Sequence, residues 1–261
     1  MRALKLARRR PEAFESGGRT MLVFAGLLGS SFILVSLVVG GRLLLLGLRS
    51  GRTPELTVGF GLFAMGGFGC PLMLVAQQAS TLGDGTRGAL ALAATSVLSL
   101  GQVSLAVFTK QVFRPKQSWA SAVVWALALA FAVCVVGQTV QPTYAAIARG
   151  EALQWLSYRV LQTAVLAWSG AESLHYARVS ARRQRIGLSD RATTNRFQLW
   201  AGSTLICMVL SFVTSVLDPK LSQSLVGVML AAPVSLAASV SLWFAFLPPR
   251  FYIRWLSQQP A

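Results

Sequence analysis

The sequence predicts an all-α, polytopic membrane protein: a bundle of seven transmembrane helices followed by a short interfacial segment. The first observation is composition, because 54% of the 261 residues are hydrophobic and only 12% are charged. Soluble domains have about twice that charged share. The second is a mean hydropathy of +0.59. The third is the recurrence of apolar runs long enough to cross about 30 Å of hydrocarbon, with short connections that leave no room for a soluble domain.

The order of these runs divides the chain into three parts. They are a basic leader at residues 1–20, a seven-helix transmembrane domain at 21–247 and an interfacial cytoplasmic tail at 248–261. The expected spans cover residues 21–39, 56–79, 88–109, 119–141, 155–177, 200–216 and 222–247. In the leader, Pro11 and the pair Gly17-Gly18 disfavour a long helix.

Local patterns support two of these assignments. The second span has five glycines ahead of Pro71, which permits close helix packing and predicts a kink at the proline. The tail alternates aromatic side chains with Arg250 and Arg254, a pattern typical of a helix that lies in the membrane interface.

The distribution of basic residues predicts the orientation in the membrane. Fourteen of the 24 lysines and arginines lie in the tail and in the connections after spans one, three and five, against four on the other side. The positive-inside rule then puts the amino terminus outside and the carboxyl terminus in the cytoplasm. The six basic residues of the leader favour the opposite orientation, so either the other connections outweigh them or Met21 is the true start.

The net charge of +16 also predicts partners. On a membrane protein it indicates anionic lipid, and no nucleic-acid-binding motif is present, so no nucleic acid is expected. In the densest basic segment, Gly187 is expected to end one helix and Asp190 to begin the next. Two interpretations stay open: anchoring to anionic lipid, or docking of a cytoplasmic protein partner that is acidic. The residues assigned to this contact are Arg178, Arg182, Arg183, Arg185, Arg191 and Arg196.

The fifth span holds the most varied chemistry within the predicted membrane. His175, the only histidine, and Tyr176 lie three and four residues after Glu172, within reach on one helix face. In one interpretation Glu172 and His175 form a protonatable pair that binds a proton or a polar ligand. In the other, Glu172 is a counter-charge for the arginines. Further polar residues on helical stripes complete this candidate site: Gln162, Ser169, Gln102 and Gln138.

No metal site, cofactor or catalytic machinery is expected. The three cysteines lie singly in apolar runs, and with one histidine they cannot form a zinc site of the usual composition. Glu-x-x-His occurs in di-iron bundles, but those need it twice with two further carboxylates. Because no nucleophile–base pair is evident, we do not expect an enzyme.

Three segments carry a resemblance to known proteins. They are VFRPKQSW at residues 112–119, RRQRIGLSDRATTNRFQLW at 182–200 and FLPPRFYIRW at 246–255. They resemble pieces of uncharacterised bacterial seven-span integral membrane proteins, which implies a multi-pass protein of the cell inner membrane and brings no known activity. Retinal proteins are excluded because the last span has no lysine, and seven-span sugar transporters because spans one and five have no proline.

These observations favour a receptor-like or regulatory multi-pass membrane protein with a polar intramembrane core and a basic cytoplasmic face. The alternative is a small-solute transporter or channel that uses the same polar core.

The predicted topology can be tested with reporters. Alkaline phosphatase and green fluorescent protein are fused separately after Gly187 and after Ala261. Because both points lie on the side with more basic residues, we expect fluorescence without phosphatase activity at both. Phosphatase activity at both points would show that the bundle has the opposite orientation.

Overall fold

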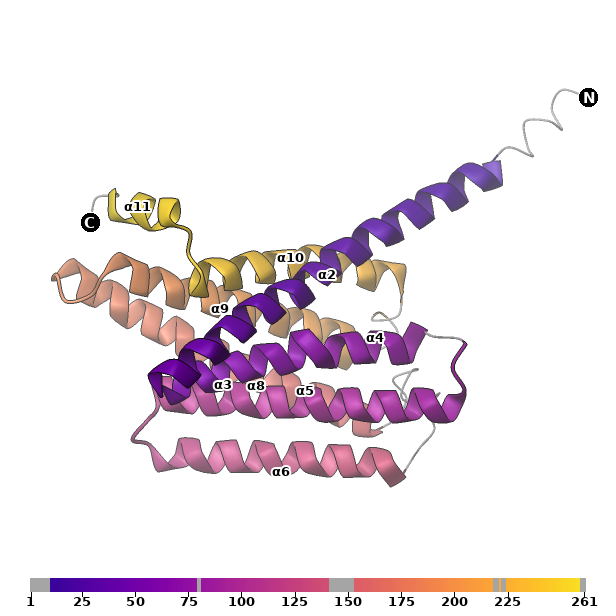
Figure 1. The fold of residues 1–261 in the computed structure, drawn as a ribbon, viewed down its shortest axis with the longest axis horizontal. Helices are drawn as coiled ribbons and strands as arrows, with labels where there is room; N and C mark the ends of the chain where they lie inside the picture. Colours follow the sequence, from indigo (N-terminus) through magenta and orange to yellow (C-terminus); the bar gives the residue numbers. More distant parts are fainter. Residues whose placement is uncertain (1–9, 79–80, 141–152, 218–220, 222–223, 259–261) are drawn as a thin grey trace, which may run out of the picture.

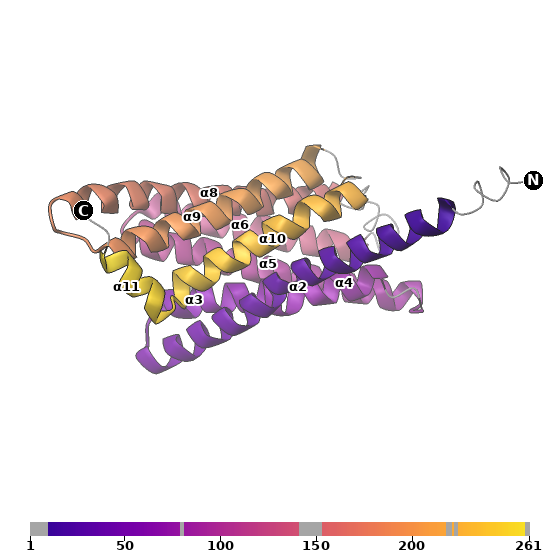
Figure 2. The same ribbon diagram turned by 90° about the horizontal axis from the view of Figure 1, so that it is seen from above.

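The computed structural model is an almost wholly helical bundle (Figures 1 and 2), and it describes residues 10–78, 81–140, 153–217, 221 and 224–258. The elements are α2 (Arg10–Ser50), α3 (Thr53–Leu62), η1 (Phe63–Gly69), α4 (Cys70–Gln78), α5 (Asp84–Phe113), α6 (Ser118–Val140), α8 (Leu153–Arg185), α9 (Arg191–Phe212), η2 (Val213–Leu217), α10 (Leu225–Phe246) and α11 (Arg250–Gln258). The turns η1 and η2 are π-helical and continue the helices before them.

Five of the described helical segments are long and apolar enough to cross a membrane. They are Gly26–Ser50, Thr53–Gln77, Asp84–Phe113, Ser118–Val140 and Val226–Phe246. The helices α8 and α9 run beside them (Figure 2) but are more polar and fall short of the same criterion. The all-α class is therefore confirmed and a membrane protein is indicated, while seven spans stays a prediction.

The degree of burial separates central helices from peripheral ones. The helix α5 packs against α3, α4, α6 and α8, and half of its apolar window is buried, compared with 17% for α6. On α6 the exposed apolar side chains form a stripe at helical spacing: Trp125, Leu129, Val133, Val136 and Val140. A continuous apolar stripe of this kind suits contact with hydrocarbon rather than water, as expected for the outer helix of a membrane bundle.

The leader is partly helical, contrary to the sequence prediction. The helix α2 begins at Arg10 and continues without a break through Pro11 and Gly17-Gly18 to Ser50. A proline at the second position of a helix is tolerated because its missing N–H has no intrahelical partner there. The glycines lower helix stability by about 1 kcal/mol each without forbidding it. Residues 1–9 lie outside the described part of the chain.

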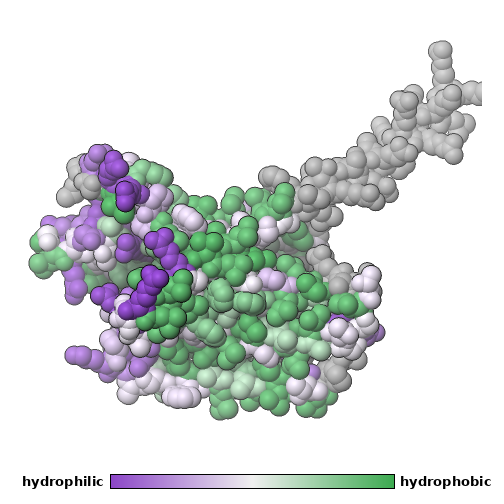
Figure 3. All heavy atoms as spheres, viewed as in Figure 1, coloured by the Kyte–Doolittle hydropathy of each residue, from purple (hydrophilic) through white to green (hydrophobic). Residues whose placement is uncertain are grey.

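The basic connections gather at one end of the bundle. The turn from α2 to α3, the connection from α5 to α6, the hairpin from α8 to α9 and the helix α11 all lie at the left in Figure 1. Hydrophilic residues are concentrated at the same end in Figure 3. We call this the basic end. The charge asymmetry of the sequence is thus an asymmetry of the folded bundle, and which side of the membrane it faces remains a prediction.

The second expected span is one continuous rod with a π-helical turn in place of a sharp kink. The turn η1 immediately precedes α4, in which Pro71 is the second residue. A π turn shifts the backbone pairing where proline cannot donate a hydrogen bond. Its glycines face neighbouring helices, because a Cβ on Gly67 would meet Leu37 of α2 and one on Gly69 would meet Leu98 of α5.

The hairpin between α8 and α9 has the predicted ends. Gly187 has a φ of +73°, and the N–H of Leu188 donates to the carbonyl of Arg183 at 2.9 Å, as in a Schellman C-cap. The carboxylate of Asp190 accepts a hydrogen bond from the N–H of Thr193 and begins α9. Local chemistry alone therefore fixes this turn.

The tail forms the expected amphipathic helix. Leu256 of α11 is buried, whereas Phe251 and Trp255 are 66% and 52% exposed. Tyr252 holds α11 against the bundle, because it packs on Phe244 of α10 and accepts a hydrogen bond from Asn195 of α9 at 2.8 Å. Exposed aromatic residues beside arginines suit the headgroup region of a bilayer.

Close contact between α2 and α3 can be tested at Gly59. A Cβ there would lie 2.7 Å from the backbone nitrogen of Leu44 and 3.0 Å from the carbonyl oxygen of Gly40. Backbone atoms cannot move aside without separating the helices, so Gly59→Ala should lower the free energy of unfolding by about 1–3 kcal/mol. The measurement is thermal denaturation in detergent.

The matched control is Gly202→Ala on α9, where a Cβ meets nothing within 4 Å. Alanine favours a helix over glycine, so this variant should lose no stability. Equal melting temperatures for the two variants would contradict the close contact.

Candidate functional site

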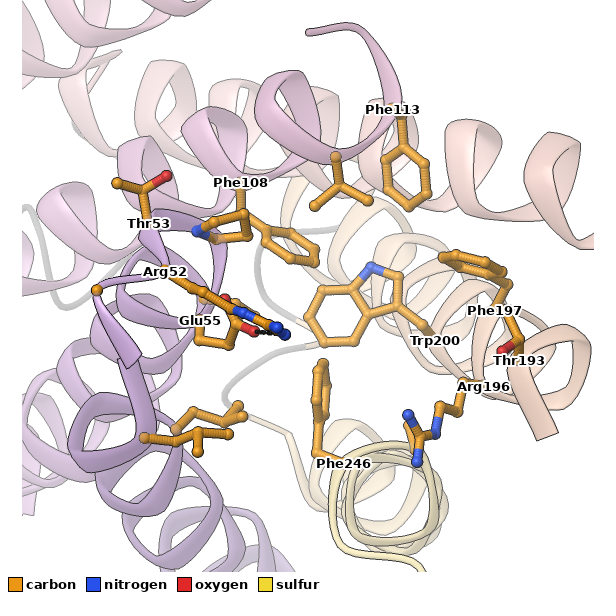
Figure 4. Close-up of a pocket in the computed structure, with 17 residues that line it drawn as sticks. Arg52, Thr53, Glu55, Phe108, Phe113, Thr193, Arg196, Phe197, Trp200 and Phe246 are labelled. Carbon is orange, nitrogen blue, oxygen red and sulfur yellow. Dashed lines mark ion pairs between the residues drawn. The ribbon is translucent and has the colours of Figure 1, made fainter. Parts of the chain in front are cut away.

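A pocket of about 890 Å³ opens at the basic end between α2, α3, α5, α9 and α10 (Figure 4). Small-molecule sites in proteins occupy roughly 300–1,000 Å³. We call it the Trp200 pocket, because the indole of Trp200 lies at the centre of the side chains that line it. Five helices contribute to the pocket, so it exists only in the folded bundle.

Aromatic side chains form the inner wall of the Trp200 pocket. Trp200 is 5% exposed, and its ring packs edge-on against Phe108 of α5 at 5.7 Å and Phe246 of α10 at 5.3 Å between centroids. Phe113 of α5 and Phe197 of α9 lie 5.7 Å apart on a further side. Such T-shaped and tilted contacts hold large rings in fixed orientations. The inner wall is therefore apolar and closely packed.

Charged side chains lie at the rim. Arg52 and Glu55, at the start of α3, form an ion pair of 3.6 Å, and Arg196 of α9 faces the same space (Figure 4). Within the described part of the chain, Arg196 takes part in no ion pair of 4.0 Å or less. Two guanidinium groups and one carboxylate leave the rim with one excess positive charge.

The pocket wall is connected to the polar side of α8. The indole nitrogen of Trp200 donates a hydrogen bond to the hydroxyl of Ser169 at 3.2 Å, and both residues are buried. One helical turn along α8, Glu172 accepts a hydrogen bond from the guanidinium of Arg114 at 2.9 Å. From Ser169, polar groups of α8 thus continue through Glu172 toward the hairpin.

The buried carboxylate of Glu172 has its counter-ion in the connection between α5 and α6. Its side chain is 8% exposed and that of Arg114 is 30% exposed. The hydrogen bond to Glu172 raises the pKa of Arg114 above its ordinary value, so the guanidinium is charged at every accessible pH. The guanidinium carbon also lies 5.9 Å from the ring centre of Trp119, within cation–π distance.

The structure does not bring Glu172 and His175 together as a protonatable pair. His175 is exposed and its ring lies beside that of Tyr176. Tyr176 donates its hydroxyl proton to the carbonyl of Phe113 at 3.1 Å and packs against Phe113 and Phe197 of the pocket wall. The arrangement resembles the counter-charge interpretation, with Arg114 in place of the predicted arginines.

The predicted glutamines lie apart from this centre. Gln162 of α8 accepts a hydrogen bond from Arg159 at 3.0 Å. Gln102 of α5 and Gln138 of α6 are 2% and 4% exposed. The amide oxygen of Gln102 and both amide atoms of Gln138 have no hydrogen-bond partner among the described residues. Of the seven predicted intramembrane residues, Ser169 and Tyr176 therefore contact the pocket wall and Glu172 pairs with Arg114. No hydrogen bond among the described residues joins the three glutamines to them.

The arginine hairpin, residues 178–196, extends the basic end. Arg178, Arg182, Arg183, Arg185 and Arg196 are exposed and Arg191 is partly exposed. At its base, the N–H of Thr193 lowers the pKa of Asp190 below the ordinary 3.8. The cap therefore stabilises the hairpin fully above pH 3.8, and this contribution is lost as the pH falls through the lowered pKa of Asp190.

Sequence reasoning missed the Trp200 pocket. Of the predicted site and contact residues, only Arg196 lines it. A usable signal existed in the aromatic residues near the basic ends of three spans: Phe108, Phe113, Phe197, Trp200 and Phe246. Such residues are also ordinary interfacial anchors, so their convergence on one space requires the fold.

Comparison with known proteins gives no family: no protein-family model, no curated protein and no solved structure matches this chain. Among the described residues no group of three or more histidine, cysteine, aspartate or glutamate side chains could hold a metal ion.

The ion pair between Arg114 and Glu172 can be tested by removing one partner or both. Arg114→Gln leaves a buried carboxylate without its charged donor and should lower the free energy of unfolding by roughly 1–3 kcal/mol. In the double variant Arg114→Gln/Glu172→Gln the neutral amide needs no counter-ion, so stability should partly return. Thermal denaturation of purified protein measures both. A double variant less stable than Arg114→Gln would rule out the pairing as the cause.

Proposed function

We propose that this protein is a receptor-like regulatory component of a bacterial inner membrane. In this proposal the amino terminus is outside and the basic end faces the cytoplasm. A ligand binds in the Trp200 pocket, and its presence changes the position or mobility of the arginine hairpin, which contacts anionic lipid or an acidic cytoplasmic protein.

The observation that supports this proposal most is the double role of Trp200. Its ring forms the centre of the pocket wall, and its indole N–H is bonded to Ser169 of α8. A ligand that shifts this ring acts directly on both helices that carry the hairpin. A change of state needs such a difference in contacts between the occupied and the empty form.

A second set of contacts reaches the hairpin from its base. Thr193 and Arg196 both line the pocket, and Thr193 supplies the N–H that binds Asp190 at the start of α9. The positive charge of Arg196 also acts on Asp190. An anionic group that binds Arg196 in the pocket therefore weakens the attraction between this arginine and the carboxylate of Asp190.

The output surface is the set of exposed arginines on the hairpin. Each basic residue near an anionic membrane surface contributes about 1 kcal/mol to binding, and the effect falls off within a Debye length. A small displacement of the hairpin along the membrane normal thus changes its affinity for lipid headgroups or for an acidic partner.

Transport is the second candidate function, and the buried amides of Gln102 and Gln138 support it, because polar groups inside spans often mark a solute path. Contacts between α2, α3 and α5 are nevertheless close, since a Cβ on Gly40 would lie 2.8 Å from backbone of η1 and one on Gly61 would lie 3.2 Å from backbone of α5. Solute uptake into proteoliposomes that Glu172→Gln abolishes would favour transport over regulation.

The coupling between pocket and hairpin can be tested without knowing the ligand. Ala245 of α10 lines the pocket and is 3% exposed, so Ala245→Phe places a benzyl group where a ligand would lie. We expect hydrogen–deuterium exchange of the amides at residues 183–194 to change at least severalfold, because the inserted ring presses on Trp200 and α9.

The matched control is Ala237→Phe, which adds the same ring to the exposed side of the same helix. It should leave exchange in the hairpin unchanged. If Ala245→Phe folds with an unaltered melting temperature and exchange in the hairpin equals that of the control, the proposed coupling is wrong. If Ala245→Phe does not fold, Phe246→Ala tests the same wall by removing a ring.

A further inference from the structure

We propose that the ligand of the Trp200 pocket is an amphiphilic anion: a carboxylate or phosphate group joined to an apolar chain. This inference deepens the proposed function, on which it rests in taking the pocket as the ligand site. It follows from three properties of the pocket: where its polar groups lie, the sign of their charge and the position of its mouth.

The pocket is divided into an apolar interior and a charged rim. The rings of Trp200, Phe108 and Phe246 form the interior. The guanidinium groups of Arg52 and Arg196 belong to exposed residues at the surface. A ligand with one polar end and one apolar body satisfies both parts. A wholly polar ligand would lose its hydration against the rings without gaining partners.

The sign of the charge selects an anion. Arg196 is in no ion pair within the described residues, and Arg52 has only Glu55, at 3.6 Å and near the surface. Guanidinium groups bind carboxylate and phosphate through paired hydrogen bonds. A cationic head would meet the excess positive charge of the rim and of the surrounding basic end, so it would be disfavoured.

The mouth lies where an amphiphile from a membrane would present its head. Leu46 of α2 lines the pocket and is 51% exposed, next to the exposed turn that holds Arg52. One side of the mouth is thus apolar and belongs to a membrane-spanning helix, and the other is charged. A chain can enter past Leu46 while its head stays at the interface. The source of the anion is either the leaflet or the aqueous phase.

Photochemical labelling of the full-length protein in phosphatidylcholine nanodiscs tests this proposal. The probe is palmitate with a diazirine on its chain, and mass spectrometry locates the label. We expect label on the peptides that contain Phe108, Trp200 and Phe246. Dodecyl phosphate should compete, whereas dodecanol, which has no charge, and inorganic phosphate, which has no chain, should not.

Charge variants at the rim give effects of opposite sign. Arg196→Gln should weaken competition by dodecyl phosphate about tenfold, the usual size of a lost charge-assisted hydrogen bond. Glu55→Gln removes the competing carboxylate from Arg52 and should strengthen it. The matched control is Arg185→Gln, which removes another exposed arginine that does not line the pocket. It should have no effect.

Ala245→Phe should abolish pocket labelling, and Ala237→Phe should not.

Two further arms identify the source of the anion. Loss of label when phosphatidylglycerol is added to the nanodiscs indicates a leaflet phospholipid. Loss only with single-chain acids indicates a soluble amphiphile. Both support the proposed chemistry.

The proposal fails if label spreads over the lipid-facing stripe of α6, if dodecanol competes as well as dodecyl phosphate, or if Arg196→Gln and Arg185→Gln behave alike. Its failure is separable from that of the proposed function. Specific labelling without a change in hairpin exchange would contradict regulation alone, and a responsive hairpin without labelling would contradict the ligand class alone.

Discussion

The carboxylate of Glu172 sets the arrangement of the basic end. A charge inside an apolar bundle must be paired, and its partner Arg114 lies 58 residues earlier in the chain. Pairing therefore fixes the end of α5 against α8. It also places Phe113 against Tyr176 and Phe197, which completes one wall of the Trp200 pocket. A local electrostatic requirement thus determines the shape of a space that is itself mostly apolar.

The sequence was informative wherever a property depends on near neighbours or on composition. The span expected at residues 119–141 is α6 at Ser118–Val140, because the transition from polar to apolar residues there is abrupt. Gly187 and Asp190 end and begin helices as predicted, since a left-handed turn and a side-chain cap need only a few adjacent residues. The basic connections gather at one end because they follow alternate helices of the bundle, and successive helices run in opposite directions.

Properties that depend on distant contacts were not predictable. The sequence does not distinguish His175 from Arg114 as the partner of Glu172, because reach along one helix does not show which neighbouring helix packs against it. The Trp200 pocket draws on five helices, and its residues satisfy the simpler interpretation of interfacial anchors. For α8 and α9, buried polar side chains such as Ser169 and Thr204 lower the mean hydropathy. Counting spans by composition is therefore least decisive for the two helices that the arginine hairpin joins.

The π-helical turn η1 has a consequence for how this protein tolerates change. A π turn contains one residue more than the α-helix would need, and each residue of an α-helix turns it by about 100°. Deleting one residue between Phe63 and Gly69 would let the rod become a regular α-helix while α4 keeps the same face toward its neighbours. Ala76, now fully buried, would stay in the core. The surplus residue of η1 thus lets this rod lose one residue without changing which faces of α3 and α4 are packed.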